Sequence, residues 1–278
     1  MAAAATAGSI RDALAGAADA LAAMGVATPR LDAELLLVEA TGWDRARLAA
    51  EPEAGVAPDA GRRFGEMVRR RLRREPVAYI LGRKGFRSIE LAVDRRVLIP
   101  RPETELLVEL ALELGPRRLL DVGTGSGAIA LAIADELPGC EAIATDTSTA
   151  ALEVARANAK RLGLAGRIEL IEAMLPADPG ELDLIVANLP YVAEREWRTL
   201  EPELTEWEPR EALLAGPDGL DVLRAAIPAA AAVAPALALE VGAGQAAAVS
   251  ELLFEAGFAT VETRADLAGI ARVVWGRR

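Results

Sequence analysis

The first part of the chain has apolar positions at helix spacing and no stretch with the two-residue period of a strand. Between about Ile10 and Arg74, apolar side chains recur every three or four positions, which places them on one face of each helix. Thr28 followed by Pro29 is typical of a helix start, because proline at the first helical position lacks an amide hydrogen that would go unpaired. The pattern predicts a small helical bundle over residues 1–80.

The period changes after Tyr79. Apolar residues alternate with polar ones up to Val97, and alternation over short runs is typical of paired strands with one buried face. We therefore expect a β-hairpin linker over residues 81–98. The two prolines in the following Leu98–Glu105 run favour extended backbone, and a helix is expected from Glu103.

From Arg118 to the end, short apolar runs alternate with helical patterns. This alternation is typical of a mostly parallel sheet with helices on both faces. We predict an α/β domain over residues 99–278 with a seven-stranded sheet, closed by an antiparallel pair. The expected strands are Leu119–Val122, Glu141–Thr145, Ile168–Ile171, Leu182–Ala187, Ala236–Val241, Ala259–Thr263 and Ala271–Trp275.

Composition narrows the classes of protein. Of 278 residues, 52% are hydrophobic and 26% charged, so the chain can bury a core and is not of disordered composition. It has no histidine and one cysteine, Cys140, which excludes imidazole general bases, histidine-ligated zinc and intrachain disulfides. We expect a cytoplasmic monomer without a metal site.

No segment predicts membrane insertion. The apolar run Ala225–Leu239 is interrupted by Pro228 and Pro235 and is too short to span a bilayer. The Ala-rich stretch Met1–Gly8 has no basic region ahead of a long apolar core, so we do not expect a signal peptide.

The charge balance is acidic, with 42 acidic and 31 basic residues and a formal net charge of −11. A general nucleic-acid binder needs a basic footprint, so we expect no stable nucleic-acid partner. One basic cluster stands out, and it is either a solvated helix face or a docking patch for an acidic partner or RNA phosphates. It consists of Arg62, Arg63, Arg69, Arg70, Arg71, Arg73 and Arg74.

A glycine-rich run, Asp121–Gly127, joins the first strand of the predicted sheet to a helix. Glycines there let the backbone approach a ligand at the carboxyl end of a strand, although a glycine turn alone can be purely structural. The spacing differs from the dinucleotide-binding G-x-G-x-x-G pattern, and no Gly-Lys-Ser/Thr follows. Asp146 ends the next strand, where a carboxylate can accept hydrogen bonds from both ribose hydroxyls of an adenosine. Together these features predict S-adenosylmethionine as cofactor.

A polar tetrapeptide, Asn188-Leu189-Pro190-Tyr191, follows the fourth strand at the same edge of the sheet. An amide or aromatic amino nitrogen is a poor nucleophile because its lone pair is delocalised. The Asn188 side-chain oxygen and the Leu189 carbonyl can accept both of its hydrogens and hold it in line with a methyl donor. In this hypothesis Pro190 fixes the turn and Tyr191 stacks on a planar group. The alternative is an ordinary turn, where Asn and Pro are common.

Further stretches make the chain resemble the release factor glutamine methyltransferases, the HemK-like proteins, over nearly its whole length. The Pro-Arg-Pro-Glu-Thr-Glu run is the most discriminating, whereas many methyltransferases share the glycine loop. The matching stretches are Glu75–Gly82, Leu98–Glu105, Asp121–Gly127, Glu208–Leu213, Gly216–Asp221 and Asp266–Arg272.

The resemblance implies a Rossmann-like methyltransferase domain and an N-terminal helical domain that helps dock the substrate protein. It implies methyl transfer from S-adenosylmethionine to the side-chain amide nitrogen (N5) of the glutamine in the Gly-Gly-Gln motif of bacterial class-1 peptide chain release factors. Asn188 is the implied catalytic residue, and Met174 matches the residue that covers the adenine in the family. The implied cofactor contacts are Gly123, Thr124, Gly125, Ser126, Gly127, Asp146, Met174 and Asn188.

The family usually has Asn-Pro-Pro-Tyr at this place, and this chain departs from it at Leu189. The Asn-Leu-Pro-Tyr form of this chain is known from rRNA adenine dimethylases. If the acceptor is the backbone carbonyl of Leu189, its side chain matters little and glutamine chemistry survives. The alternative function is adenine-N6 methylation of rRNA or DNA on a flipped base. The net charge and the N-terminal helical domain disfavour it. Intact Gly125, Asp146 and Asn188 disfavour a non-catalytic binding module.

Overall fold

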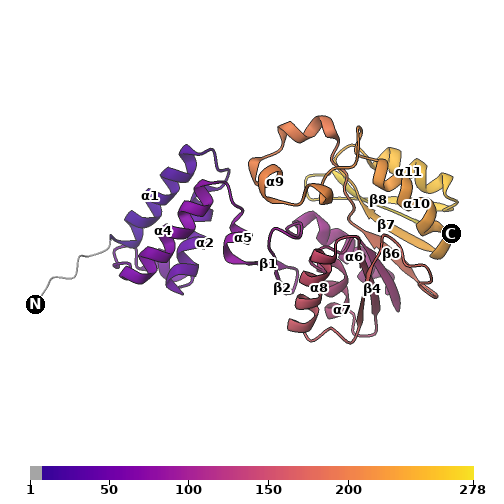
Figure 1. Cartoon of the computed structure of the whole chain (residues 1–278), viewed down its shortest axis with the longest axis horizontal. Helices are drawn as coiled ribbons and strands as arrows, with labels where there is room; N and C mark the ends of the chain where they lie inside the picture. Colours follow the sequence, from indigo (N-terminus) through magenta and orange to yellow (C-terminus); the bar gives the residue numbers. More distant parts are fainter. Residues whose placement is uncertain (1–7) are drawn as a thin grey trace, which may run out of the picture. The chain divides into compact units, whose positions relative to one another are not determined.

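The structure, a computed structural model, describes residues 8–278, and the chain divides into two compact units after Gly82 (Figure 1). Residues 1–7, which belong to the first predicted domain and to the stretch not expected to be a signal peptide, lie outside the described residues. Within residues 8–278, no helix combines the length and the apolar character that a membrane crossing requires.

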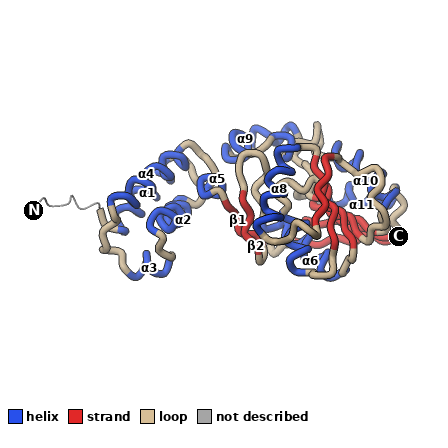
Figure 2. The backbone as a smooth tube through the Cα atoms, turned by 60° about the horizontal axis from the view of Figure 1, so that its bottom comes forward, coloured by secondary structure: helices blue, strands red, loops and turns tan. Residues whose placement is uncertain are grey.

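The first unit is a helical bundle. Its helices are α1 (Ile10–Ala23), α2 (Pro29–Thr41), α3 (Arg45–Ala50), α4 (Pro58–Leu72) and α5 (Val77–Leu81). The three long helices, α1, α2 and α4, contact one another (Figures 1 and 2). Ser9 and Asp12 form a capping box at the start of α1, which satisfies two backbone amides that a helix start leaves unpaired. Fully buried side chains such as Leu21 and Leu36 form the core between the helices.

Some side chains of the arginine cluster form hydrogen bonds within this unit. Arg71 is 6% exposed, and its Nε donates to the Asp32 carboxylate on α2 at 2.7 Å. Arg70 donates to both carboxylate oxygens of Glu75, at 2.6 and 2.8 Å, and Arg63 donates to a backbone carbonyl of α2. These side chains stabilise the contacts of α4, so a uniformly solvated face does not describe the cluster.

The second unit is built on a seven-stranded sheet with the order β5-β4-β3-β6-β7-β9-β8. The strands are β3 (Arg118–Val122), β4 (Glu141–Asp146), β5 (Ile168–Glu172), β6 (Leu184–Ala187), β7 (Ala236–Glu240), β8 (Thr260–Ala265) and β9 (Ala271–Arg277). Strands β3 to β7 are parallel, and β9 is antiparallel to both of its neighbours. The predicted mostly parallel sheet with a closing antiparallel pair is confirmed.

Helices cover both faces of this sheet. The helices of this unit are α6 (Glu105–Leu114), α7 (Ala128–Glu136), α8 (Thr149–Arg161), α9 (Pro202–Trp207), α10 (Asp221–Val233) and α11 (Ala246–Glu255), with 3-10 turns η1 (Pro102–Thr104), η2 (Glu194–Thr199) and η3 (Arg210–Ala212). Side chains alternate faces along a strand. Leu120 and Val122 of β3 pack with α10 and α11 in one core, whereas Asp121 between them accepts from the first turn of α7. Helices α10 and α11 therefore lie on the face opposite α7, side by side (Figures 1 and 2).

The predicted hairpin is present as β1 (Arg83–Phe86) and β2 (Ile89–Ala92), and it belongs to the second unit, where β2 contacts α7 and α8. Asn158 in α8 is fully buried, and its Oδ1 accepts from the Ala92 amide at 2.7 Å. Its Nδ2 donates to the Ala92 carbonyl at 3.0 Å and to the Ser126 carbonyl at 2.9 Å. One side chain thus joins the hairpin, α8 and the glycine-rich run.

We expect Asn158→Ala to lower the free energy of unfolding by about 2–4 kcal/mol, because it leaves buried backbone groups of Ala92 and Ser126 without partners. Urea unfolding at neutral pH measures this loss. Arg156→Ala, on the exposed face of the same helix, is the control and should stay within about 0.5 kcal/mol of wild type. Equal effects of the two changes would show that Asn158 does not tie these elements together.

Candidate active site

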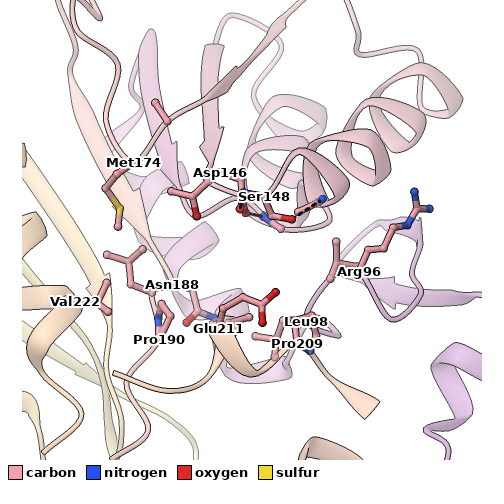
Figure 3. A pocket seen from close by; sticks show the side chains of 18 residues that line it. Arg96, Leu98, Asp146, Ser148, Met174, Asn188, Pro190, Pro209, Glu211 and Val222 are labelled. Carbon is pink, nitrogen blue, oxygen red and sulfur yellow. Dashed lines mark hydrogen bonds between the residues drawn. The ribbon is translucent and has the colours of Figure 1, made fainter. Parts of the chain in front are cut away.

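A cavity opens at the carboxyl ends of β3, β4 and β6 (Figure 3). It has about 850 Å³ of empty space, the open solvent at its mouth included. The carboxyl edge is where ligands bind in open α/β sheets. The residues that line it come from the loop before η1, the glycine-rich run, the segments after β4, β5 and β6, the Pro209–Ala212 segment, and one residue each of α8 and α10.

The glycine-rich run has left-handed backbone at each of its glycines, but for different reasons. At Gly127 (φ +85°) a Cβ would come within 2.7 Å of the Leu131 side chain, so the absence of a side chain allows α7 to pack. At Gly125 (φ +56°) a Cβ would meet nothing within 4 Å, and this residue lines the cavity. Gly125 therefore presents bare backbone to a ligand.

Asp146, the last residue of β4, fixes the loops on either side of it (Figure 3). Its Oδ2 accepts from the Gly125 amide at 2.9 Å and its Oδ1 accepts from the Ser148 amide at 2.8 Å. A carboxylate oxygen can accept two hydrogen bonds. Asp146 thus anchors the glycine-rich run and keeps acceptor capacity on the cavity side.

Asp121 lies beneath the run and is fully buried. Its Oδ2 accepts from the Thr124 hydroxyl at 2.7 Å and from the Ala130 amide at 3.2 Å. Its Oδ1 has no hydrogen-bond partner within residues 8–278. Burial raises the pKa of this carboxyl to about 6, against the lowering effect of the Thr124 hydrogen bond.

The tetrapeptide after β6 is held by three separate contacts. The Nδ2 of Asn188 donates to the Thr104 hydroxyl at 3.1 Å, and Leu189, 3% exposed, belongs to the core on the α10 side of the sheet. The Tyr191 hydroxyl donates to Oε1 of Glu240 at 3.2 Å. Asn188 and Pro190 line the cavity, whereas the Tyr191 ring does not.

Glu208 joins two stretches that are far apart in the sequence. Its carboxylate is buried, accepts from the Ile99 amide at 3.0 Å and forms an ion pair with Arg101. Leu98, next to Ile99, and Pro209, next to Glu208, both line the cavity. The ion pair therefore builds one wall of the cavity.

The predicted site residues divide into two groups. Those that line the cavity are Gly123, Gly125, Asp146, Met174, Asn188, Leu189 and Pro190. Four others do not line it: Thr124, Ser126, Gly127 and Tyr191. The Thr124 and Tyr191 hydroxyls and the Ser126 carbonyl form hydrogen bonds inside the protein, and Gly127 is the N-cap of α7. Sequence reasoning assigned no role to Leu98, Pro209 or Glu211, although the stretches that resemble the family contain all three. The described part of the chain has no cluster of acidic or cysteine residues suited to a metal ion.

Comparisons with known proteins give the class. Residues 102–204 match the methyltransferase small domain, and residues 12–82 match the PrmC N-terminal domain. Among solved structures, a methyltransferase from Pyrococcus furiosus superposes with a TM-score of 0.52 at 16% identity, over 70% of this chain and 91% of that one. The matched domain and the superposed sheet give the chain a methyltransferase fold, with a cavity at the carboxyl edge of its sheet.

Close relatives narrow the class to a family. The release factor glutamine methyltransferase of Cereibacter sphaeroides is 43% identical over 96% of this chain and 97% of its own length. That of Moorella thermoacetica is 44% identical over 87% and 89%. The chain belongs to the release factor glutamine methyltransferase family.

Because Asp121 is buried, we expect the free energy of unfolding to depend on pH. Its pKa in the folded state, about 6, lies above its ordinary value, so its contribution to stability is lost as the pH rises through about 6. Asn at this position carries no charge at any pH. We expect Asp121→Asn to gain roughly 1 kcal/mol relative to wild type between pH 5 and pH 8, measured by urea unfolding at both pH values. A difference that is constant over this range would contradict the raised pKa.

Proposed function

We propose that this protein transfers a methyl group from S-adenosylmethionine to the side-chain amide nitrogen of the glutamine in the Gly-Gly-Gln motif of class-1 release factors. Family membership supports the substrate, because relatives that match nearly the whole chain are release factor glutamine methyltransferases. The proposed chemistry rests on how the Asn188 amide is held. Its nitrogen donates a hydrogen bond to the Thr104 hydroxyl, and its oxygen has no hydrogen-bond partner among residues 8–278.

The cavity fits the proposed cofactor in three respects. Gly125 leaves open space where any side chain would project, and Asp146 retains acceptor capacity for ribose hydroxyls. Met174, an exposed apolar side chain on the cavity wall, supplies a surface for the adenine (Figure 3). When bound, S-adenosylmethionine supplies an electrophilic methyl group on a positively charged sulfur.

The residues of the chain position the nucleophile. A carboxamide nitrogen attacks weakly because its lone pair is delocalised into the carbonyl. The Asn188 oxygen and the Leu189 backbone carbonyl accept its two hydrogens, fix its orientation and stabilise the positive charge that develops on it. One of these hydrogens leaves as a proton when the new bond forms, so the product is a singly methylated amide.

The N-terminal unit is proposed to help dock the release factor, which is consistent with its match to the PrmC N-terminal domain. The chain's net charge of −11 disfavours the alternative of a nucleic-acid adenine as substrate.

The direct experiment offers labelled S-adenosylmethionine with a purified release factor, with the same factor carrying a Gln→Ala change in its Gly-Gly-Gln motif, and with rRNA. We expect label in the first alone, located on the motif glutamine by mass spectrometry. Label on the altered factor would overturn the assigned glutamine, and label only on the RNA would overturn the function.

We expect Asn188→Ala to lower kcat by about 100-fold or more, because it removes one preorganised acceptor of the substrate amide. The Kd for S-adenosylmethionine, measured by calorimetry, should change by less than about threefold, so the loss lies in turnover. Unchanged turnover would remove Asn188 from the mechanism.

We expect Asp146→Asn to act on the cofactor instead. The change removes the negative charge and places a donor where acceptors are needed, so the Kd for S-adenosylmethionine should rise about 10–100-fold. At saturating cofactor, kcat should recover to within a few-fold of wild type. A Kd within twofold of wild type would contradict the assignment of Asp146 to the ribose.

A further inference from the structure

We propose that Gln245 is a positioning residue for methyl transfer, an inference that rests on the proposed function for its catalytic consequence. Its side-chain amide holds the backbone of the Asn188–Tyr191 loop and thereby fixes the direction of the Leu189 carbonyl, the second acceptor of the substrate amide. Gln245 does not line the cavity, so cofactor binding does not account for its contacts. The three hydrogen bonds of its side chain are called here the Gln245 bridge.

The Gln245 bridge joins three segments of the second unit through their backbone groups. The Oε1 of Gln245 accepts from the Gly242 amide at 2.9 Å, in the turn between β7 and α11. Its Nε2 donates to the Tyr191 carbonyl at 2.9 Å and, more weakly, to the Gly219 carbonyl ahead of α10 at 3.4 Å. The Gln245 backbone amide also closes the turn, because it donates to the Gly242 carbonyl at 3.1 Å. The loop after β6 is thus bonded to the segments that lead into two helices.

Donor and acceptor chemistry leaves the Gln245 amide only one orientation. A backbone amide can only donate and a backbone carbonyl can only accept, so the side-chain oxygen must face Gly242 and the nitrogen must face Tyr191. Gln245 is also the N-cap residue of α11, a helix that buries Val249 and Leu253 in the core. The bridge therefore starts from an element whose position is fixed by packing.

Two glycines allow the bridged segments to come this close. A Cβ at Gly219 (φ +81°) would overlap the Tyr191 carbonyl oxygen and lie 2.8 Å from the Gln245 nitrogen. A Cβ at Gly242 would lie 2.8 Å from the Gln245 oxygen and 3.2 Å from the Tyr191 ring. Gly219 belongs to the Gly216–Asp221 stretch that resembles the family, none of which lines the cavity. The bridge gives this stretch a role.

The Leu189 carbonyl lies between two fixed points of the loop. The Leu189 side chain is 3% exposed in the core, and the Tyr191 carbonyl is held by the bridge. Pro190 between them has a φ locked by its ring and favours extended backbone at the residue before it. The Leu189 carbonyl itself has no hydrogen-bond partner among residues 8–278, so its direction depends on these two anchors.

The first test separates the hydrogen bonds that Gln245 donates from the one that it accepts. Gln245→Glu keeps an oxygen for the Gly242 amide but, when ionised, cannot donate to the Tyr191 carbonyl, and Gln245→Met keeps a long side chain without any of the three bonds. Both should lower kcat by about tenfold or more, whereas the KM for the release factor and the Kd for S-adenosylmethionine should stay within about threefold of wild type. A kcat of Gln245→Glu within about twofold of wild type, or a loss confined to KM, would overturn the proposal.

Ala247→Glu is the matched control for the charge that Gln245→Glu adds. Ala247 is exposed on the first turn of α11, so this variant places the same charge nearby without removing a bond of the bridge. Its kcat should stay within about twofold of wild type. A loss as large as that of Gln245→Glu would show that the charge slows the reaction and not the missing donor, which would refute the bridge.

The second test displaces the Tyr191 carbonyl from the Gly219 side. Gly219→Ala places a methyl group against this carbonyl and should lower kcat by about tenfold or more. Gly269→Ala is the matched control, because its φ of +78° strains alanine in the same way whereas its Cβ would meet nothing within 4 Å. Its kcat should stay within about threefold of wild type. Equal kcat for the two variants would contradict the proposal, and the Gln245 variants decide it where Gly219→Ala does not fold.

The third test needs no substrate and separates the bridge from the proposed function. Hydrogen–deuterium exchange with mass spectrometry reports how often the backbone amides of residues 188–193 open. In Gln245→Met these amides should exchange about tenfold faster than in wild type, while a peptide that covers β4 exchanges at the wild-type rate. Unchanged exchange over residues 188–193 would show that the bridge does not hold the loop. Faster exchange, together with a wild type that methylates no release factor, would refute the proposed function and leave the bridge standing.

Discussion

An amide nitrogen becomes a usable nucleophile only where fixed acceptors hold its hydrogens, and this constraint explains how the cavity is built. Four parallel strands end at the same edge of the sheet and supply the glycine-rich run, Asp146, Asn188 and Glu240. Asp146 is bonded to a backbone amide, and Asn188 and Glu240 are bonded to the hydroxyls of Thr104 and Tyr191, so the positions of these side chains are determined before any ligand arrives. Preorganisation of this kind is the main way in which a protein stabilises developing charge.

Several buried carboxyl groups lie near the same edge of the sheet, where burial of their charge destabilises the folded protein. Asp121, Glu208 and Glu240 are all buried, and one oxygen each of Asp121 and Glu240 has no hydrogen-bond partner within residues 8–278. A buried carboxylate lowers the free energy of unfolding unless hydrogen bonds or a counter-charge compensate. Glu208 is compensated by Arg101, whereas the other two rely on hydroxyls and one amide. The molecule retains these groups where they support the cavity, which is consistent with stability given up for function.

The sequence predicted the helices and strands in which apolar residues recur with a single clear period, including the strand that ends at Asp146. It also predicted the loop that begins at Asn188. It did not reveal α9, which is too short to show a helical period, or α10 and α11, because alanine-rich and proline-interrupted segments show no clear period. The contact of Thr124, Ser126 and Tyr191 with the ligand stays a prediction, and in the structure the Thr124 and Tyr191 hydroxyls and the Ser126 carbonyl bond inside the protein. Motif spacing identifies which loop reaches the cavity, but which side of the loop faces it depends on long-range partners. Two hydrogen bonds of the site, Ile99 to Glu208 and Asn188 to Thr104, join segments that are far apart in the sequence. No local sequence pattern predicts such a contact.

The proposed reaction requires the Asn188 oxygen and the Leu189 carbonyl to receive the substrate amide. A crystal structure of the protein with S-adenosylhomocysteine and a Gly-Gly-Gln peptide shows whether they do. Both oxygens should lie within roughly 3.2 Å of the glutamine amide nitrogen, with the Asn188 nitrogen still on Thr104. A glutamine amide bound by other acceptors, with the Asn188 oxygen turned to Thr104, would contradict it.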